Sequence, residues 1–217
     1  MAEKDYNHRM ATFDERAAEW DSNASRRAMT LALADAILAR LDLKGGETVL
    51  DYGAGTGILA LKLQPRVARI IAADASRGML DVLKGKLTTL GATAIETMLL
   101  DLERDDVAAP NADIVVSTMT LHHVKDVGRL ARKLFAILHA GGKIALADLE
   151  TESGDFHDDR TGVYHRGFDR AALVAQFSAA GFVKVEASIA YVYTKPRPGG
   201  VTKDYPILLL TGEKRSP

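Results

Sequence analysis

The stretch of residues 48–58, TVLDYGAGTGI, constrains the fold of this 217-residue chain more than any other. A short run of β-forming residues leads into Gly53, Gly55 and Gly57, and a helical pattern begins at Ile58. Glycines let the backbone turn sharply and approach a ligand closely, because no Cβ is in the way. The N-terminus of the following helix offers free N–H groups and the positive end of a dipole. The stretch therefore predicts a strand, a loop able to bind a nucleotide-like cofactor, and a helix.

The spacing of the glycines distinguishes between cofactors. The dinucleotide fingerprint G-x-G-x-x-G needs a third glycine three residues after the second, and Ile58 occupies that position. The sequence instead reads D-x-G-x-G-x-G, starting at Asp51. This pattern resembles the first motif of the class I S-adenosylmethionine-dependent methyltransferases. A glycine turn in an unrelated α/β fold is the alternative interpretation.

Composition narrows the class of protein. A hydrophobic content of 47% suits one globular domain, and the formal net charge of −1 gives no strong positive field. We therefore expect neither a nucleic acid nor a membrane as a partner. The absence of cysteine excludes disulfides, thiolate zinc sites and cysteine nucleophiles. The charged N-terminal residues do not resemble a signal peptide and no apolar run could cross a bilayer, so we expect a soluble, cytoplasmic protein.

Apolar runs alternate with helical patterns along the chain. Strands are predicted at residues 48–52, 69–74, 95–100, 113–117 and 143–147, with helices between most of them and at 25–41. One helix is expected to be capped by Asp126 and to end at Gly141 and Gly142. This alternation predicts βαβ units, a parallel sheet covered on both faces and an α/β fold. Two late strands, 183–194 and 205–211, are separated only by a loop and should pair antiparallel.

The resemblance implies more than the residue pattern derives. It implies a Rossmann-like three-layer fold with a seven-stranded, mostly parallel sheet, strand order 3-2-1-4-5-7-6 and an antiparallel last strand. We divide the single domain into an N-terminal helical lid or cap segment, residues 1–44, and a methyltransferase core, residues 45–217. In the family the leading segment folds over the cofactor. Trp20 is therefore predicted to be a lid aromatic or, as an equal alternative, a core anchor.

Acidic residues stand at most of the predicted strand ends, where ligands bind in an open parallel sheet. Four of the five ends carry an acid and one carries a serine: Asp51, Asp74, Asp101, Asp148 and Ser117. Asp74 ends the second strand and can accept hydrogen bonds from both hydroxyls of a ribose. A helix cap or a solvated loop acid is the alternative interpretation of Asp74.

The resemblance assigns the other parts of the cofactor. It implies that Asp101 accepts from the adenine amine, that the Leu102 N–H reaches a ring nitrogen and that Met79 packs near the adenine. A loop acid is the alternative for Asp101. The predicted cofactor is S-adenosyl-L-methionine, and its predicted binding residues are Asp51, Gly53, Gly55, Gly57, Asp74, Met79, Asp101, Leu102, Ser117 and Trp20.

The segment 117–124, STMTLHHV, resembles the fourth motif of small-molecule methyltransferases in this class. It does not resemble the Asn/Asp-Pro-Pro-Tyr motif of enzymes that methylate DNA bases or glutamine amides. His122 and His123 either provide a general base or have a structural role beside the cofactor. Further substrate-side candidates are His157, Tyr164, His165 and Arg166, and no metal site is predicted.

The prediction is an S-adenosylmethionine-dependent methyltransferase that transfers a methyl group in line to a small-molecule acceptor. A protein that binds the cofactor but catalyses nothing is one alternative. A nicotinamide-dependent oxidoreductase is a weaker alternative, because Ile58 replaces the third glycine of the fingerprint. The sequence leaves open the acceptor, its reacting atom and the oligomeric state.

Overall fold

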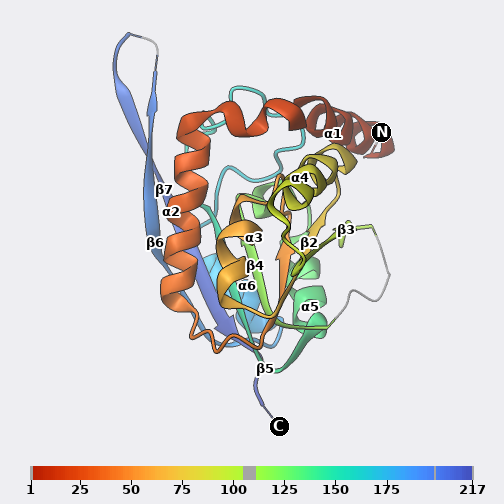
Figure 1. Cartoon of the computed structure of the whole chain (residues 1–217). Coiled ribbons are helices and arrows are strands. Elements are labelled where there is room, and N and C mark those ends of the chain that lie inside the picture. Colours follow the sequence, from red (N-terminus) through yellow and green to blue (C-terminus); the bar gives the residue numbers. More distant parts are fainter. Residues whose placement is uncertain (1, 105–110, 198, 217) are drawn as a thin grey trace.

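The computed structural model describes residues 2–104, 111–197 and 199–216 (Figure 1). Within these residues seven strands form one sheet in the order β3-β2-β1-β4-β5-β7-β6. The strands are β1 (Thr48–Tyr52), β2 (Arg69–Asp74), β3 (Ile95–Leu99), β4 (Ala112–Thr118), β5 (Leu138–Leu149), β6 (Val183–Pro196) and β7 (Thr202–Glu213). β1 to β5 pair in parallel, and β7 runs antiparallel to β5 and β6. The predicted fold class, strand order and antiparallel last strand are confirmed.

Helices cover both faces of the sheet. The α-helices are α1 (Ala2–Arg16), α2 (Ala24–Arg40), α3 (Ile58–Leu63), α4 (Arg77–Leu90), α5 (Val127–Ile137) and α6 (Arg170–Ala179). Short 3-10 helices are η1 (Ala17–Ser22), η2 (Gln64–Arg66) and η3 (Leu121–His123). α2, α3 and α4 lie on one face and α5 and α6 on the other, which gives three layers (Figure 1).

Each layer is held by an apolar helix face on the sheet. In α2 the side chains of Leu33 and Ile37 are 0% exposed and pack in the same cluster as Val49 of β1. Complete burial of each such side chain stabilises the fold by about 1.5–3 kcal/mol. α2 is therefore part of the layered core, although it lies within residues 1–44. Only α1 and η1 of that segment lie across the carboxyl ends of the strands (Figure 1).

One predicted helix boundary is wrong. Asp126 caps α5 as predicted, because its side chain accepts a hydrogen bond from the Arg129 N–H at 2.8 Å. The helix ends at Ile137, however, and not at Gly141. Leu138 already has an extended backbone and pairs with Ala112, so the sheet takes over before the glycines are reached.

The hairpin of β6 and β7 forms an arm that extends beyond the body of the molecule (Figure 1). Both strands continue further than the sequence predicted, to Pro196 and from Thr202. Because β6 and β7 stay paired up to Pro196 and Thr202, only a short connection joins the two strands. Every helix in the described ranges is too short or too polar to cross a membrane.

Candidate functional site

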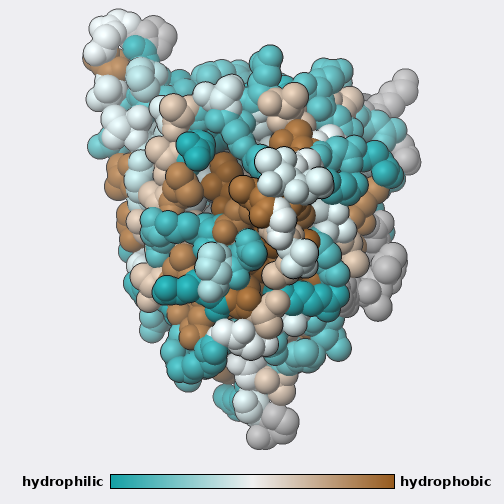
Figure 2. All heavy atoms as spheres, viewed as in Figure 1, coloured by the Kyte–Doolittle hydropathy of each residue, from teal (hydrophilic) through white to brown (hydrophobic). Residues whose placement is uncertain are grey.

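A cavity of about 580 Å³ opens at the carboxyl ends of β1 to β4, beneath α1 and η1. Its size is typical of small-molecule sites. Figure 2 shows apolar residues gathered in the hollow between α2 and α4. Six of the ten predicted cofactor residues line the cavity, namely Trp20, Gly53, Gly55, Asp74, Met79 and Asp101. Both predicted histidines, His122 and His123, also line it.

The glycine loop connects β1 to α3 and forms one wall of the cavity. Gly53 has a φ of 75°, and a Cβ there would lie 2.2 Å from the Thr120 Oγ1. Gly55 has a φ of 54°, and no described atom lies within 4 Å of where its Cβ would be. Packing therefore requires glycine at position 53. At position 55 the left-handed backbone favours glycine and leaves space on the cavity side.

Asp74 ties this loop to the start of α4. Its carboxylate accepts from the Gly55 N–H at 2.7 Å and from the Ser76 N–H at 2.8 Å. Burial raises the pKa of Asp74, and the backbone hydrogen bonds to Ser76 and Gly55 oppose that shift. Each carboxylate oxygen has two lone pairs, so Asp74 can also accept from a ligand in the cavity.

Asp101 lines the far end of the cavity and is held by α1. It accepts from the Glu103 N–H at 2.9 Å, and the Arg9 guanidinium of α1 lies 4.0 Å from its other oxygen. Arg9 is only 5% exposed and also donates to the His123 carbonyl. Burial and Asp101 raise the pKa of Tyr6 to about 12. No sequence pattern points to Arg9, because its burial depends on where α1 docks.

Four predicted cofactor residues lie behind the cavity wall in the described structure. The Ser117 hydroxyl donates to the Tyr52 carbonyl at 2.6 Å and so joins the ends of β4 and β1. Gly57 packs against Leu83, where a Cβ would be 2.2 Å from a methyl carbon. Leu102 is a buried core residue. Direct cofactor contact by these residues, including that of the Leu102 backbone N–H, therefore stays a prediction, as it does for Asp51.

Asp51 is buried beneath the start of α3. It is 1% exposed, and neither carboxylate oxygen has a hydrogen-bond partner among the described residues. Burial raises the pKa of Asp51 to about 8, and the charge of Asp74 raises it further. Without a bound cation nearby, the Asp51 carboxyl is therefore largely protonated at neutral pH.

Two aspartates fasten the N-terminal segment over the cavity. Asp14 of α1 accepts from the Gly78 N–H at 2.8 Å at the start of α4, where a Cβ on Gly78 would meet the Asp14 backbone. Asp21 accepts from the Thr56 hydroxyl at 2.6 Å. Trp20 lies between Asp14 and Asp21 in the sequence. Its ring packs edge-on against Phe13, with ring centroids 5.8 Å apart.

His122 forms a buried pair with Asp148 at the end of β5. Nδ1 of His122 lies 2.7 Å from the Asp148 carboxylate, and both side chains are 1% exposed. Asp148 also accepts from the backbone N–H groups of His122 and Leu149, at 3.2 and 2.7 Å. With Asp148 as the acceptor, Nδ1 carries the proton and Nε2 presents its lone pair. Nε2 has no hydrogen-bond partner in the described ranges.

His123 has a different environment. Its Nδ1 lies 2.8 Å from the Gly162 carbonyl, and its ring packs edge-on against Phe13 with centroids 5.2 Å apart. Burial first, and then the neighbouring His122, hold the pKa of His123 well below its usual value. His123 therefore stays neutral and links the loop at residue 162 to the lid.

Of the other substrate-side candidates, only His157 lines the cavity. Its ring centroid lies 4.8 Å from that of His122. His165 instead hydrogen-bonds to the Val124 carbonyl at 2.9 Å, and Arg166 packs against Gly154. Tyr164 is 44% exposed. The sequence could not separate these residues, because all four lie in one irregular loop.

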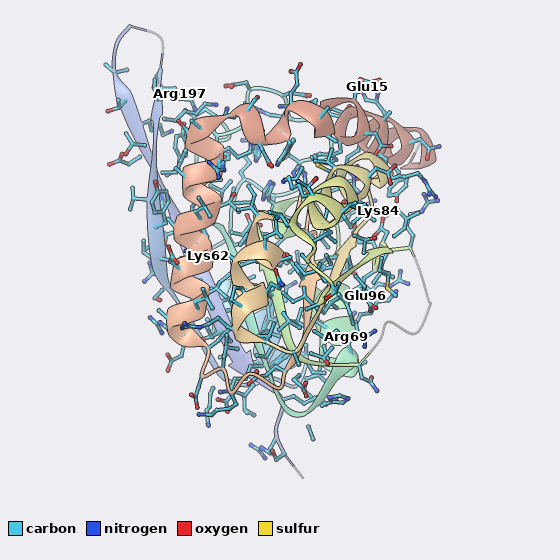
Figure 3. The ribbon with its side chains drawn as sticks, in the orientation of Figure 1. Glu15, Lys62, Arg69, Lys84, Glu96 and Arg197 are labelled. Carbon is cyan, nitrogen blue, oxygen red and sulfur yellow. The ribbon has the colours of Figure 1, made fainter. Side chains whose placement is uncertain are left out.

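The β6–β7 arm holds the loop that carries His157. Nζ of Lys195 lies 2.8 Å from both the Phe156 carbonyl and the Asp158 carboxylate. Arg197, labelled in Figure 3 at the arm, donates to the Asp155 carbonyl and the Tyr205 hydroxyl. Burial lowers the pKa of His157 to about 4. His157 is therefore neutral at physiological pH. In the described residues no group of three or more His, Asp or Glu side chains could hold a metal ion.

Comparison with known proteins identifies the family. Residues 24–187 match the family model described as a methyltransferase domain. The chain belongs to the methyltransferase domain family. An uncharacterized methyltransferase of Schizosaccharomyces pombe is 31% identical over 158 residues, which are 66% of this chain and 56% of that protein. The methyltransferase chain thus spans little more than half the length of this relative.

Solved structures agree on the fold. The phosphoethanolamine N-methyltransferase 2 of Haemonchus contortus, in complex with S-adenosyl-L-methionine, superposes with a TM-score of 0.69 and 17% identity over 84% of this chain and 52% of its own. The 4+2 cyclase SpnF superposes with a TM-score of 0.69 and 17% identity over 91% of this chain and 83% of its own. At these identities the comparison shows the fold alone.

Family membership confirms the resemblance to class I methyltransferases and assigns S-adenosylmethionine as the cofactor. The cavity of this methyltransferase fits that molecule chemically. Gly55 leaves open space on the cavity side, and Asp74 can accept from ribose hydroxyls. Asp51, which has no hydrogen-bond partner among the described residues, is a buried acid that a ligand ammonium group would stabilise.

Proposed function

We propose that this chain is an enzyme that transfers the methyl group of S-adenosylmethionine in line to a small-molecule acceptor. The observation that supports this proposal most is one cavity lined by the glycine loop, Asp74 and His122. A cofactor site and a proton-accepting group thus share one cavity. The proposal extends the family assignment to an activity of this chain.

In the proposed complex Asp74 binds the ribose hydroxyls, and Asp101 accepts from the adenine amine. Met79 packs against the adenine, and the Leu102 N–H reaches a ring nitrogen. Asp51 stabilises the methionine ammonium from behind the glycine loop. Gly53, Gly55, Gly57 and Ser117 shape the backbone around the methionine end.

S-adenosylmethionine, when bound, supplies a methyl group that is already electrophilic because it is carried on a sulfonium. The protein has to hold the acceptor in line and exclude water. We assign water exclusion to α1 and η1, which the anchors at Asp14 and Asp21 hold over the cavity with Trp20. On this basis we propose that α1 and η1 of residues 1–44 form the lid, and that α2 belongs with the core at 45–217.

A general base is needed only if the acceptor atom carries a proton. Of the two predicted histidines, His122 suits this role, because Asp148 orients it and its Nε2 lacks a partner among the described residues. His123 is bound to the Gly162 carbonyl and held neutral, so we propose a structural role for it.

A catalytically silent cofactor-binding protein is the second candidate. The 4+2 cyclase SpnF has a similar fold, so the fold alone does not establish that this chain transfers a methyl group. Release of S-adenosylhomocysteine in a panel of small acceptors tests the proposal. Release with one acceptor class supports it, whereas tight S-adenosylhomocysteine binding without any turnover favours the silent protein. Thermal stabilisation by NAD but not by S-adenosylhomocysteine would support the oxidoreductase instead. The cytoplasmic location stays a prediction.

A further inference from the structure

The acceptor side of the cavity contains two imidazole nitrogens that lack partners. Nε2 of His122 and Nε2 of His157 are both buried, and neither has a hydrogen-bond partner among the residues described. Their rings lie 4.8 Å apart by centroid, and both residues line the cavity. A buried polar atom without a partner costs about 1–3 kcal/mol, so a ligand that satisfies both nitrogens gains that stabilisation.

The two nitrogens differ in what they can offer. Asp148 accepts from Nδ1 of His122, so Nε2 of His122 is an acceptor. His157 is neutral, and the tautomer with a proton on Nε2 makes that atom a donor. In that tautomer the two nitrogens are one acceptor and one donor, which matches a hydroxyl group, because a hydroxyl donates and accepts through a single atom. In the same tautomer an ammonium, which offers only donors, and a carboxylate, which offers only acceptors, each leave one nitrogen unsatisfied.

The aromatic side chains around the two histidines favour an apolar, aromatic body for the acceptor. Phe13, Phe156, Tyr193 and Met119 line the same cavity. Lys195, the cation beside His157, already binds the Asp158 carboxylate and the Phe156 carbonyl. The aromatic side chains offer contact area to an acceptor. Arg16 and Arg26 also line the cavity, and both guanidinium groups lie over the Trp20 ring.

We propose that the acceptor is an aromatic hydroxyl compound, that His157 is a further acceptor-binding residue and that Asp148 is a positioning residue for His122. In the reaction the acceptor oxygen forms a bond to the methyl carbon. The carbon–sulfur bond breaks and leaves its electron pair on sulfur, giving neutral S-adenosylhomocysteine. The hydroxyl proton passes to Nε2 of His122 and then to solvent, while Asp148 stabilises the imidazolium. This inference rests on the proposed function.

Binding of three matched compounds tests the recognition step. We would titrate 2-naphthol, 2-(aminomethyl)naphthalene, which is an ammonium ion at neutral pH, and 2-naphthoic acid by calorimetry into the protein saturated with S-adenosylhomocysteine. We expect 2-naphthol to bind at least about tenfold more tightly than the other two, because only it satisfies both nitrogens. His157→Phe should remove that preference and leave the affinity for S-adenosylhomocysteine unchanged. Equal binding of the three compounds, binding of none, or an unchanged preference in the variant would overturn the inference.

Kinetics with 2-naphthol test the proton transfer. His122→Asn should lower kcat by about 10²–10⁴-fold with a small change in KM. The deficit should shrink at least about tenfold with a nitro-substituted, more acidic naphthol, because that acceptor ionises without a base. Adding Asp148→Asn to His122→Asn should cost little more, because Asp148 acts only through His122. An additive loss, or an equal deficit with both naphthols, would contradict the assignment.

The pH profile of kcat is a further readout of proton transfer to His122. Charged or titratable groups around His122 come from β5, η3, the His157 loop, β6 and α1: Asp148, His123, His157, Asp158, Lys195 and Arg9. His122→Asn should give a pH profile of kcat that differs from that of wild type, because the variant side chain cannot take the hydroxyl proton. The exposed pair of His139 and Asp113, 3.0 Å apart and remote from the cavity lining, gives the matched control, and His139→Asn should change neither kcat nor its pH profile.

The binding and methylation results with these compounds also separate this inference from the proposed function. Failure to bind S-adenosylhomocysteine would contradict the proposed function itself. Tight S-adenosylhomocysteine binding with methylation of 2-(aminomethyl)naphthalene or 2-naphthoic acid instead of 2-naphthol would preserve the methyltransferase and overturn only the hydroxyl acceptor.

Discussion

Replacing Asp74 with alanine should weaken cofactor binding without unfolding the protein. The Asp74 carboxylate lines the cavity and accepts from the Gly55 and Ser76 N–H groups at 2.7 and 2.8 Å. In the proposed complex it also accepts from two ribose hydroxyls. Hydrogen bonds to a charged group contribute about 1.5–3 kcal/mol each, but water can enter the space that alanine leaves. We therefore expect a loss of about 1–3 kcal/mol, or roughly 5- to 150-fold in Kd.

The measurement is a calorimetric titration of S-adenosylhomocysteine into wild type and Asp74→Ala. Asp81→Asn is the matched control, because Asp81 lies on α4 with a 59% exposed side chain paired to Lys84. It should bind the ligand like wild type. The melting temperature of Asp74→Ala without ligand should change little, because the two unpaired N–H groups are offset by removal of a buried carboxyl whose pKa is raised. An unchanged Kd in Asp74→Ala would mean that the ribose lies elsewhere.

Two further predictions concern stability. Burial raises the pKa of Asp51 from near 4 in the unfolded chain to about 8 in the folded chain. Between these two pH values the folded chain keeps a proton on Asp51 that the unfolded chain has lost. The free energy of unfolding should therefore fall with rising pH, by up to about 1.4 kcal/mol per pH unit. In urea unfolding without ligand, Asp51→Asn should flatten the dependence of stability on pH. Asp35→Asn, a change at an exposed aspartate, should leave that dependence unchanged. An unchanged pH dependence in Asp51→Asn would contradict the raised pKa of Asp51. Gly53→Ala should lower the free energy of unfolding by about 1–3 kcal/mol, because its Cβ would meet Thr120 at 2.2 Å, whereas Gly46→Ala, with no described atom within 4 Å, should be near neutral. Equal effects of the two alanines would show that the loop accommodates the methyl group.

The sequence predicted most of the fold because its signals are local. Residues 48–58 mark a strand, a loop and a helix start through glycine spacing alone, and the structure places β1 and α3 at those positions. The antiparallel ending followed from two strands with no helix between them. The strand order came only from the resemblance, because pairing between strands distant in sequence leaves no local pattern.

The parts of the site that the sequence missed depend on tertiary pairing. Asp148 was recognised as a strand-end acid, but its bond to His122 depends on the register that pairs Thr118 of β4 with Ala147 of β5. Arg9 acquires its role only when α1 docks across the strand ends. The early end of α5 has the same origin, since pairing of Leu138 in the sheet overrides the helical pattern.

Transfer of a labelled methyl group tests the central claim most directly. The protein would be incubated with S-adenosylmethionine carrying a deuterated methyl group and a bacterial extract divided into small molecules, protein and nucleic acid. Mass spectrometry should find the label in a small molecule, with an equal amount of S-adenosylhomocysteine released. Label in protein or nucleic acid alone, or none in any fraction although S-adenosylhomocysteine binds, would contradict the account.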